Sequence, residues 1–131
     1  MYYSHDYDTQ SYYPAMPAVT IKVSRNPLQS PITLKAILDS GADATIIPIR
    51  YLQQLKVRKE HTRWMSSVDG VRFEVDMYAV FVQIGSHQLM PVSAVGGRLN
   101  QEVIIGRDLL NHFIVTLNGL AHVIEVSDTA Y

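Results

Sequence analysis

One acid stands at the end of an apolar run, in a setting where its carboxylate could do chemistry. The run Ala36-Ile37-Leu38 leads into Asp39, and Ser40-Gly41-Ala42 follows at once. An apolar strand that ends in an acid and a glycine turn can hold a carboxylate at the floor of a cleft, because small residues let another chain approach the backbone. Asp, Ser and Gly are also common turn residues, so a plain polar turn is the alternative.

A second apolar run, close to the C-terminal end, also finishes in a glycine. Val103-Ile104-Ile105-Gly106 is followed by Arg107-Asp108 and by two leucines. Between the two runs lies Asp69-Gly70, and Asp-Gly is among the strongest short-range hairpin signals. The candidate acid, a hairpin and a second apolar-glycine segment are thus spaced along one chain.

The elements that must position these residues are mostly short strands with turn residues between them. There is no alternation of strands and helices and no internal repeat with a period of about 20–50 residues. The pattern predicts an all-β barrel or sandwich with one or two short helices. Strand patterns cover 18–23, 32–38, 44–47, 73–84, 88–95, 114–117 and 121–126, and short helices are expected at 49–55 and 107–113.

Composition and charge exclude several classes of protein. The chain has 131 residues, of which 47% are hydrophobic, so we expect one domain with a proper core. A net charge of −1 and a pI near 6.5 do not suggest a nucleic-acid binder or a polybasic membrane anchor. The absence of cysteine rules out disulfides, thiol catalysis and cysteine zinc sites. The five histidines show no ligand spacing, so neither a metal nor another cofactor is expected.

The two ends of the chain lack the patterns of a folded core. Residues 1–17 hold five tyrosines and two prolines without a period, and we expect a flexible N-terminal arm. The folded domain is expected over 18–126, with a C-terminal tail at 127–131. No run approaches the ~20 apolar residues of a membrane span, and residues 1–10 do not read as a signal peptide. A cytoplasmic location without membrane contact is the default expectation.

Taken together, Asp39-Ser40-Gly41-Ala42 and the segment 103–110 resemble the two halves of a retropepsin, the single-lobe aspartic protease of retroviruses and their cellular relatives. The first matches that family's Asp-Thr/Ser-Gly-Ala active-site loop. The second matches its apolar-apolar-Gly segment followed by Arg, a polar residue and two leucines. The resemblance covers roughly 18–117. It implies a closed retropepsin-like acid-protease barrel, one lobe per chain, acting as an aspartic endopeptidase.

The resemblance implies that Asp39 is catalytic, and the mechanism needs two carboxylates that share one proton. This chain supplies one, because Asp69-Gly70 lacks the hydroxyl residue and Asp128-Thr129-Ala130 lacks the glycine. Counting carboxylates therefore predicts a C2 homodimer in which the two Asp39 residues activate one water between them. The expected partners are a second copy of the chain and an extended peptide or protein substrate, bound as an added strand.

The neighbours of Asp39 take family roles where they match the motif. Ser40 is expected to link the two active-site loops across the dimer axis. Gly41 should let the substrate backbone pass close and accept a hydrogen bond through its carbonyl. Ala42 completes the loop without the extra hydroxyl that pepsin-like enzymes more often carry at this position, so the pKa of the dyad should be somewhat higher.

The resemblance also implies an ion pair between Asp43 and Arg107 within one subunit. If buried, the loss of either partner would cost roughly 3–5 kcal/mol, and solvated surface charges are the alternative. Substrate contacts are expected from Gly41, Asp43, Ala44 and Ile105. Burial in the core is the alternative for the two apolar residues of that set.

The hairpin at 64–73 is the candidate flap, which would cover the substrate and exclude water. Viral enzymes have a glycine-rich tip, whereas this tip has one glycine and an acid. Trp64 could line the cleft, but a lone tryptophan more often packs in a core. Viral chains stop soon after a segment like 116–118, whereas another strand follows here, so the dimer sheet could be built from a C-terminal hairpin. The tip residues are Ser66, Ser67, Val68, Asp69 and Gly70.

Two other functions compete with a peptidase. A catalytically weak dimerisation or peptide-binding module would keep the fold, and the unusual flap and the extra C-terminal strand motivate it. A phosphotransfer enzyme with Asp39 as nucleophile would need a second acid two residues on, where this chain has Gly41, and a doubly wound sheet.

Overall fold

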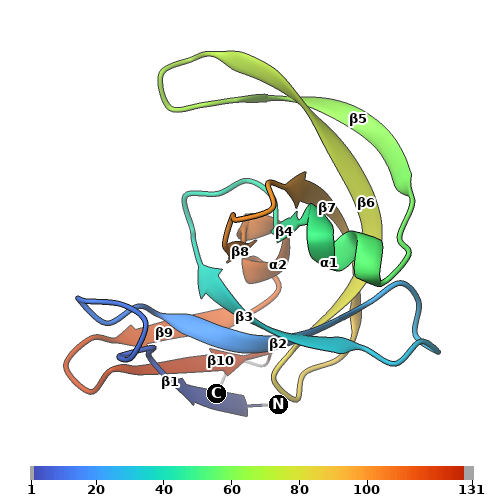
Figure 1. Ribbon diagram of the computed structural model, residues 1–131. Helices are drawn as coiled ribbons and strands as arrows, with labels where there is room; N and C mark the ends of the chain where they lie inside the picture. The colour runs from blue at the N-terminus through green and yellow to red at the C-terminus, as the bar shows by residue number, and fades with distance from the viewer. Residues whose placement is uncertain (1, 129–131) are drawn as a thin grey trace.

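The computed structural model describes residues 2–128, which form ten strands and two short helices (Figure 1). The helices are α1 (Ile49–Gln54) and α2 (Arg107–Leu110). Within the described residues no helix has the length and apolar character needed to cross a membrane. The strands are β1 (Tyr2–Asp6), β2 (Ala18–Ser24), β3 (Ile32–Leu38), β4 (Ile46–Pro48), β5 (Lys59–Ser66), β6 (Arg72–Ile84), β7 (Met90–Gly97), β8 (Val103–Ile105), β9 (Ile114–Asn118) and β10 (Val123–Ser127).

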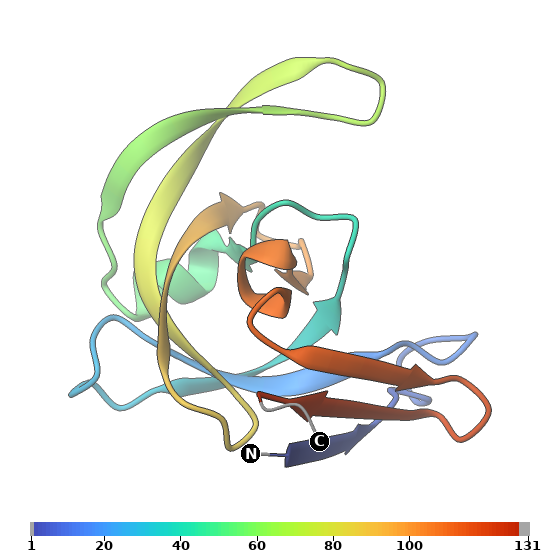
Figure 2. The same cartoon turned by 180° about the vertical axis from the view of Figure 1, so that it is seen from behind.

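Six of the strands close into a barrel, which confirms the predicted all-β barrel with two short helices. Their order is β2-β3-β8-β4-β7-β6, and β6 pairs back with β2. Closure leaves no free edge among these six strands. Figure 2 shows the barrel from behind, with α2 (the orange helix) near the centre of the view.

The barrel core is filled by the alternating apolar side chains of its strands. In β2 the side chains of Val19, Ile21 and Val23 are fully buried, as the period of two in this strand predicts. In β6 the alternation changes phase at Met77 and Tyr78, which are both buried although they are adjacent. This change of phase separates the half of β6 that pairs with β5 from the half that belongs to the barrel.

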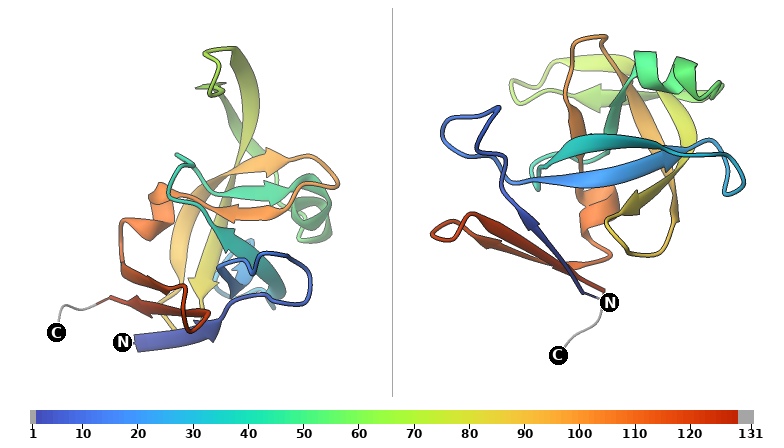
Figure 3. Two further views of the ribbon diagram at one scale, coloured as in Figure 1. Left: turned by 90° about the vertical axis from the view of Figure 1, so that its left-hand side faces the viewer. Right: turned by 60° about the horizontal axis from the view of Figure 1, so that its bottom comes forward.

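The first strand corrects the expectation of a flexible arm at residues 1–17. Residues 2–6 form β1, which pairs antiparallel with β10 and completes a three-stranded sheet of order β1-β10-β9 (Figure 3). The ring of Tyr3 packs where a Cβ on Gly85 would stand, 2.5 Å away. The partner strand lies more than a hundred residues on, so local sequence patterns did not reveal it. Ser127 ends β10, and residues 129–131 of the expected tail lie outside the described residues.

Asp8 fastens the segment between β1 and β2 to the barrel. One carboxylate oxygen accepts hydrogen bonds from the amides of Gln10 and Ser11 at 3.0 and 2.9 Å. The other accepts from Lys35 Nζ at 2.9 Å, and the side chain of Asp8 is only 2% exposed. The Ser11 amide, followed by the Lys35 side chain, lowers the pKa of Asp8 to about 2.

This anchor predicts a pH dependence of stability. Because the pKa of Asp8 is lower in the folded chain than the ~3.9 of an unfolded chain, its contribution is present above about pH 4 and is lost as the pH falls toward 2. Asp8→Asn should lower the free energy of unfolding at neutral pH and flatten its decline in this window, as urea unfolding at a series of pH values would measure. Asp6→Asn, on the exposed face of β1, is the matched control. If the free energy of unfolding of Asp8→Asn fell between about pH 4 and pH 2 as steeply as that of the wild type, the assignment would be contradicted.

Candidate active site

Asp39 lies directly after β3, where two segments far apart in the sequence meet. Strand β3 pairs in parallel with β8, with Leu38 opposite Ile105. The Asp39 amide continues this pairing by donating to the Ile105 carbonyl at 3.0 Å. The two apolar-glycine segments identified in the sequence are therefore neighbours, and the acid stands where they end.

The Asp39 carboxylate is held by its own turn and faces outward from the chain. Its Oδ1 accepts a hydrogen bond from the Gly41 amide at 2.9 Å, and its carbonyl accepts from the Ala42 amide at 3.2 Å. A Cβ at position 41 would stand 3.1 Å from Oδ1, so a side chain there would crowd the carboxylate. Both Asp39 and Ser40 are exposed in the single chain. The turn thus holds an oriented carboxylate at the surface of the chain.

Gly106 lets the active-site loop lie against the start of α2. A Cβ on Gly106 would come within 2.6 Å of the Ala44 carbonyl carbon and 2.9 Å of the Ala42 oxygen. Real Cβ atoms do not approach backbone this closely, so only glycine fits. The next amide, that of Arg107, donates to the Ala42 carbonyl at 2.9 Å. These backbone contacts therefore fix the position of the loop that carries Asp39 relative to α2.

Arg107 ties the same loop from the side. Its Nη1 donates to the Ser40 carbonyl at 2.8 Å, and its Nη2 lies against Asp43 Oδ1. The expected pairing of Asp43 with Arg107 is thus present in the structure. The two side chains are 59% and 43% exposed, so in the single chain the buried value of roughly 3–5 kcal/mol does not apply, and exposed pairs contribute about 0–1 kcal/mol.

Asp108 makes a stronger attachment that the sequence analysis did not identify. One oxygen accepts from the Thr45 amide at 2.9 Å, and the other accepts from the Thr45 hydroxyl at 2.8 Å and the Leu109 amide at 2.9 Å. Thr45 is fully buried, so these hydrogen bonds are shielded from water. A threonine after the Asp-Ser-Gly loop was a visible signal, but its partner on α2 could be found only from the fold.

The structure revises the expected substrate contacts. Ile105 is 0% exposed in the barrel core and cannot reach a substrate, and Ala44 is buried beneath the flap. Ile104, the neighbour of Ile105, points to the opposite face of β8 and is half-buried. All three residues of β8 are apolar, so no contrast in polarity could show which face was the core. Gly41 and Asp43 stay exposed beside Asp39.

The flap is the hairpin of β5 and β6, which extends beyond the barrel (Figure 1). At its tip the Ser67 amide donates to the Val71 carbonyl at 2.9 Å, and Gly70 has a φ of +85°, which favours glycine. Asp69 accepts from the Ser67 hydroxyl and from the Val71 amide. The Ser67 hydroxyl, and then the Val71 amide, lowers the pKa of Asp69. The tip is therefore a hydrogen-bonded turn that carries a charge, while Val68 projects fully into solvent.

Trp64 corrects the expectation of a core tryptophan. It lies on the flap, 55% exposed, with the Arg72 guanidinium 5.1 Å from its ring centroid. In the same hairpin Met65 and Phe73 are paired neighbours on the other face. A lone tryptophan is usually buried, but a flap has no core of its own.

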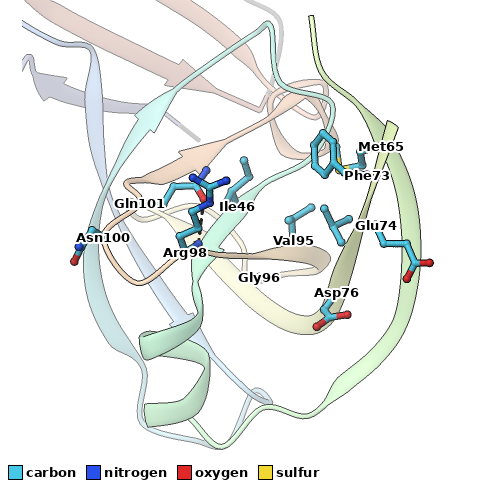
Figure 4. A pocket seen from close by; sticks show the side chains of 11 residues that line it. Ile46, Met65, Phe73, Glu74, Asp76, Val95, Gly96, Arg98, Asn100 and Gln101 are labelled. Atoms are coloured by element: carbon cyan, nitrogen blue, oxygen red, sulfur yellow. Dashed lines mark hydrogen bonds between the residues drawn. The ribbon is translucent and has the colours of Figure 1, made fainter. Parts of the chain in front are cut away.

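A cavity of about 800 Å³ lies between the flap and the barrel (Figure 4). Its apolar part comes from both sides of the gap and includes Ile46 of β4 and Phe73 of β6. Asp39 does not line this cavity in the single chain. No group of three or more His, Asp or Glu side chains within residues 2–128 is arranged to hold a metal ion.

The contacts of Asp108 predict that Asp108 contributes more to the free energy of unfolding than Asp43 does. Asp108→Asn replaces an acceptor with a donor facing Thr45, which should cost about 1–3 kcal/mol of unfolding free energy. Asp43→Asn, the matched control, breaks an exposed pair and should cost at most about 1 kcal/mol. Urea unfolding of the two variants would measure the difference. Equal costs, or a larger cost for Asp43→Asn, would contradict this description of the loop.

Comparison with solved structures finds the same fold in two proteases. A retropepsin-like aspartic protease from Rickettsia conorii is 12% identical, with a TM-score of 0.65, and the match covers 100% of this chain and 95% of that one. EIAV protease, solved in complex with the inhibitor HBY-793, is 21% identical, with a TM-score of 0.52, and the match covers 79% of this chain and 89% of that one. No curated protein sequence matches the chain.

The family model described as retroviral aspartyl protease matches residues 14–118. The matched range contains the Asp39 loop, the flap, Gly106 and Arg107, and it ends with β9. This match extends over most of the chain and agrees with the closed barrel and with the fold of both proteases. The chain therefore belongs to the retroviral aspartyl protease family and has the retropepsin-like fold.

Proposed function

We propose that the protein is a homodimeric aspartic endopeptidase whose active site forms where two copies of Asp39 meet. The observation that carries the proposal is an exposed carboxylate, oriented by the Gly41 amide and fixed on a loop that is held from behind by Gly106. A chain with one such acid needs a second copy, because the chemistry requires two carboxylates.

The reaction follows from placing two like charges in one site. Only one of the two Asp39 carboxylates ionises readily, so the pair holds a single proton. The ionised partner takes a proton from a bound water as the water oxygen bonds to the carbonyl carbon of the scissile peptide. The protonated partner donates to the carbonyl oxygen, and the resulting diol breaks down as the C–N bond cleaves and the amine takes up a proton. No covalent bond to the enzyme forms.

Neighbouring groups support this arrangement. The Ser40 hydroxyl is exposed and next to Asp39, where it can hydrogen-bond across the two-fold axis. Gly41 is exposed as well, so its backbone can meet an extended substrate. The flap would close over that substrate and exclude water. Apolar residues beside the scissile bond suit the half-buried face of Ile104.

The surface that meets the second copy is assigned to the free edge of β9. Strand β10 covers one edge of β9, and β1 covers the far edge of β10, so the chain's ends already pair with each other. The other edge of β9 pairs with no described strand, and Ile114 and Leu117 of this strand are 43% and 53% exposed. The flap tip, the Asp39 loop and the β9–β10 turn lie on the same side of the barrel (left in Figure 1). Two β9 strands pairing across a two-fold axis would form one six-stranded sheet.

A weakly catalytic peptide-binding dimer is the second candidate. The hydrogen-bonded, charged flap tip favours it, because a glycine-rich tip would bend more easily over a substrate. A confirmed dimer that binds peptides but cleaves none of a diverse library between about pH 4 and 7 would support this candidate over the first.

Substitution of the proposed catalytic acid tests the peptidase directly. Asp39→Asn should abolish cleavage of a peptide library while leaving a folded dimer, because the pair loses the carboxylate that accepts the proton of water. A statine-type inhibitor, which mimics the hydrated carbonyl, should block the wild type. Asp6→Asn is the matched control and should cleave normally, since Asp6 is exposed on β1, which pairs with β10 and not with the barrel strand that leads to Asp39. Activity retained by Asp39→Asn would rule out the mechanism.

Cross-linking tests the assigned dimer surface. The chain has no cysteine, so a single introduced thiol reports one position. In two antiparallel β9 strands related by a two-fold axis, residues near the middle of the strand face their own copies, with Cβ atoms about 4.5–5.5 Å apart. Thr116→Cys or Leu117→Cys should therefore form a cross-linked dimer under mild oxidation or with a short bifunctional reagent. Ser93→Cys, exposed on β7, is the control that should stay monomeric on denaturing gels. Failure of both β9 variants to cross-link in a dimeric sample would contradict the proposal that two chains pair through the edges of their β9 strands.

A further inference from the structure

The cavity beneath the flap is connected to Asp39 by a continuous row of apolar residues. Ile37 pairs with Ile104, Ile104 with Ile46, and Ile46 with Val95, so these four lie side by side on successive strands. The first three are half-buried. Ile37 is two positions before Asp39, and Ile46 and Val95 line the cavity. The row therefore forms a floor from the proposed catalytic site to the cavity.

The length of this floor matches a few residues of substrate. Three spacings between strands amount to about 14 Å, and an extended peptide advances about 3.3 Å per residue. A side chain in the cavity thus belongs to a residue within about four positions of the scissile bond. At about 800 Å³ the cavity is as large as pockets that hold small ligands, so it has room for a long side chain.

One wall of the cavity is a tight turn that carries Arg98. The Arg98 amide donates to Gln101 Oε1 at 3.1 Å, and the Gln101 amide donates to the Arg98 carbonyl at the same distance. A Cβ on the preceding Gly97 would come within 2.8 Å of the Ile46 side chain and 2.9 Å of Gln101 Oε1. The backbone of Arg98 is therefore fixed beside Ile46. Figure 4 shows its side chain next to those of Ile46 and Gln101.

The guanidinium of Arg98 has no hydrogen-bond or ion-pair partner among the described residues. The acids that also line the cavity do not reach it. Asp76 is paired with Lys59 at 3.8 Å, and Glu74 points away from the apolar residues in Figure 4. The cavity thus combines an apolar floor with one unpaired cation at its rim.

We propose that Arg98 is a specificity-determining residue that selects a substrate side chain with an apolar stem and a terminal carboxylate, the glutamate class. The proposal rests on the proposed peptidase function and names part of its substrate. Aliphatic carbons of the side chain lie on Ile46 and Val95, and the carboxylate accepts hydrogen bonds from the guanidinium, which suits it in a bidentate geometry.

Closure of the flap gives this contact its strength. An exposed ion pair contributes little, but Met65 and Phe73 line the same cavity from the flap and would exclude water when substrate is bound. Hydrogen bonds to charged groups then discriminate by roughly tenfold between glutamate and alanine at the same position. Glutamine, which keeps one acceptor but no charge, should fall between the two.

Peptide binding and cleavage test this inference together. A peptide series carries Glu, Gln, Ala or Lys in turn at each position within four residues of a cleaved bond. Wild-type chain is assayed for cleavage, and the Asp39→Asn variant for binding by calorimetry, both at concentrations where the chain is dimeric. Arg98→Gln should lose the preference for Glu over Ala at one position, and Arg98→Glu should prefer Lys there. Arg25→Gln, at an exposed arginine in the loop between β2 and β3, is the matched control and should keep the wild-type preference.

The two readouts separate this inference from the peptidase proposal. A preference for Glu in binding that is lost in Arg98→Gln supports the Arg98 site even if no peptide is cleaved, and in that case only the peptidase fails. Binding without preference for Glu at any position, or a preference that survives in Arg98→Gln, overturns the Arg98 site even if cleavage is efficient.

Discussion

The structure depends on one backbone contact, the approach of residues 42–44 to Gly106. The space between them excludes even a Cβ, and the Arg107 amide closes the contact with a hydrogen bond to Ala42. Strands β3 and β8 pair in parallel just before this contact, so the loop carrying Asp39 is fixed at both of its ends. Arg107 and Asp108 then attach the sides of the loop, one in solvent and one against buried Thr45. The position of Asp39 therefore derives from the packing of these two segments.

The ends of the chain shape how two such loops can meet. The range shared with the family ends with β9, and β1 and β10 lie outside it, yet these two strands pair with each other over their whole length. Because β10 lies between β1 and β9, both of its edges are paired within one chain. Its backbone amides and carbonyls are therefore not available to pair with a strand of a second copy. The outer edges of β9 and β1 remain among the described strands of this sheet, and the proposed dimer uses that of β9. On this account the extra strands support the dimer surface from behind instead of forming it.

Much of this fold could be predicted from local sequence patterns, because apolar and polar residues alternate along the barrel strands and glycine residues mark the turns. The family and the closed barrel were predicted correctly from two short motifs and their spacing. Three features could not be predicted for physical reasons. β1 forms only by pairing with a strand more than a hundred residues away. In β8 all residues are apolar, so the sequence does not show which of Ile104 and Ile105 faces the core. Trp64 lies on a hairpin that has no core of its own. The roles of Asp39 and its neighbours stay predictions that rest on geometry and family membership.

The central claim is that the single chain holds half of an active site. Specific activity measured against protein concentration, with the dimer fraction determined in the same samples by sedimentation, tests it most directly. The account predicts that activity per chain falls on dilution in proportion to the dimer fraction and returns on concentration, because each dimer brings two Asp39 carboxylates together. Activity per chain that stays constant where the protein is monomeric would contradict it.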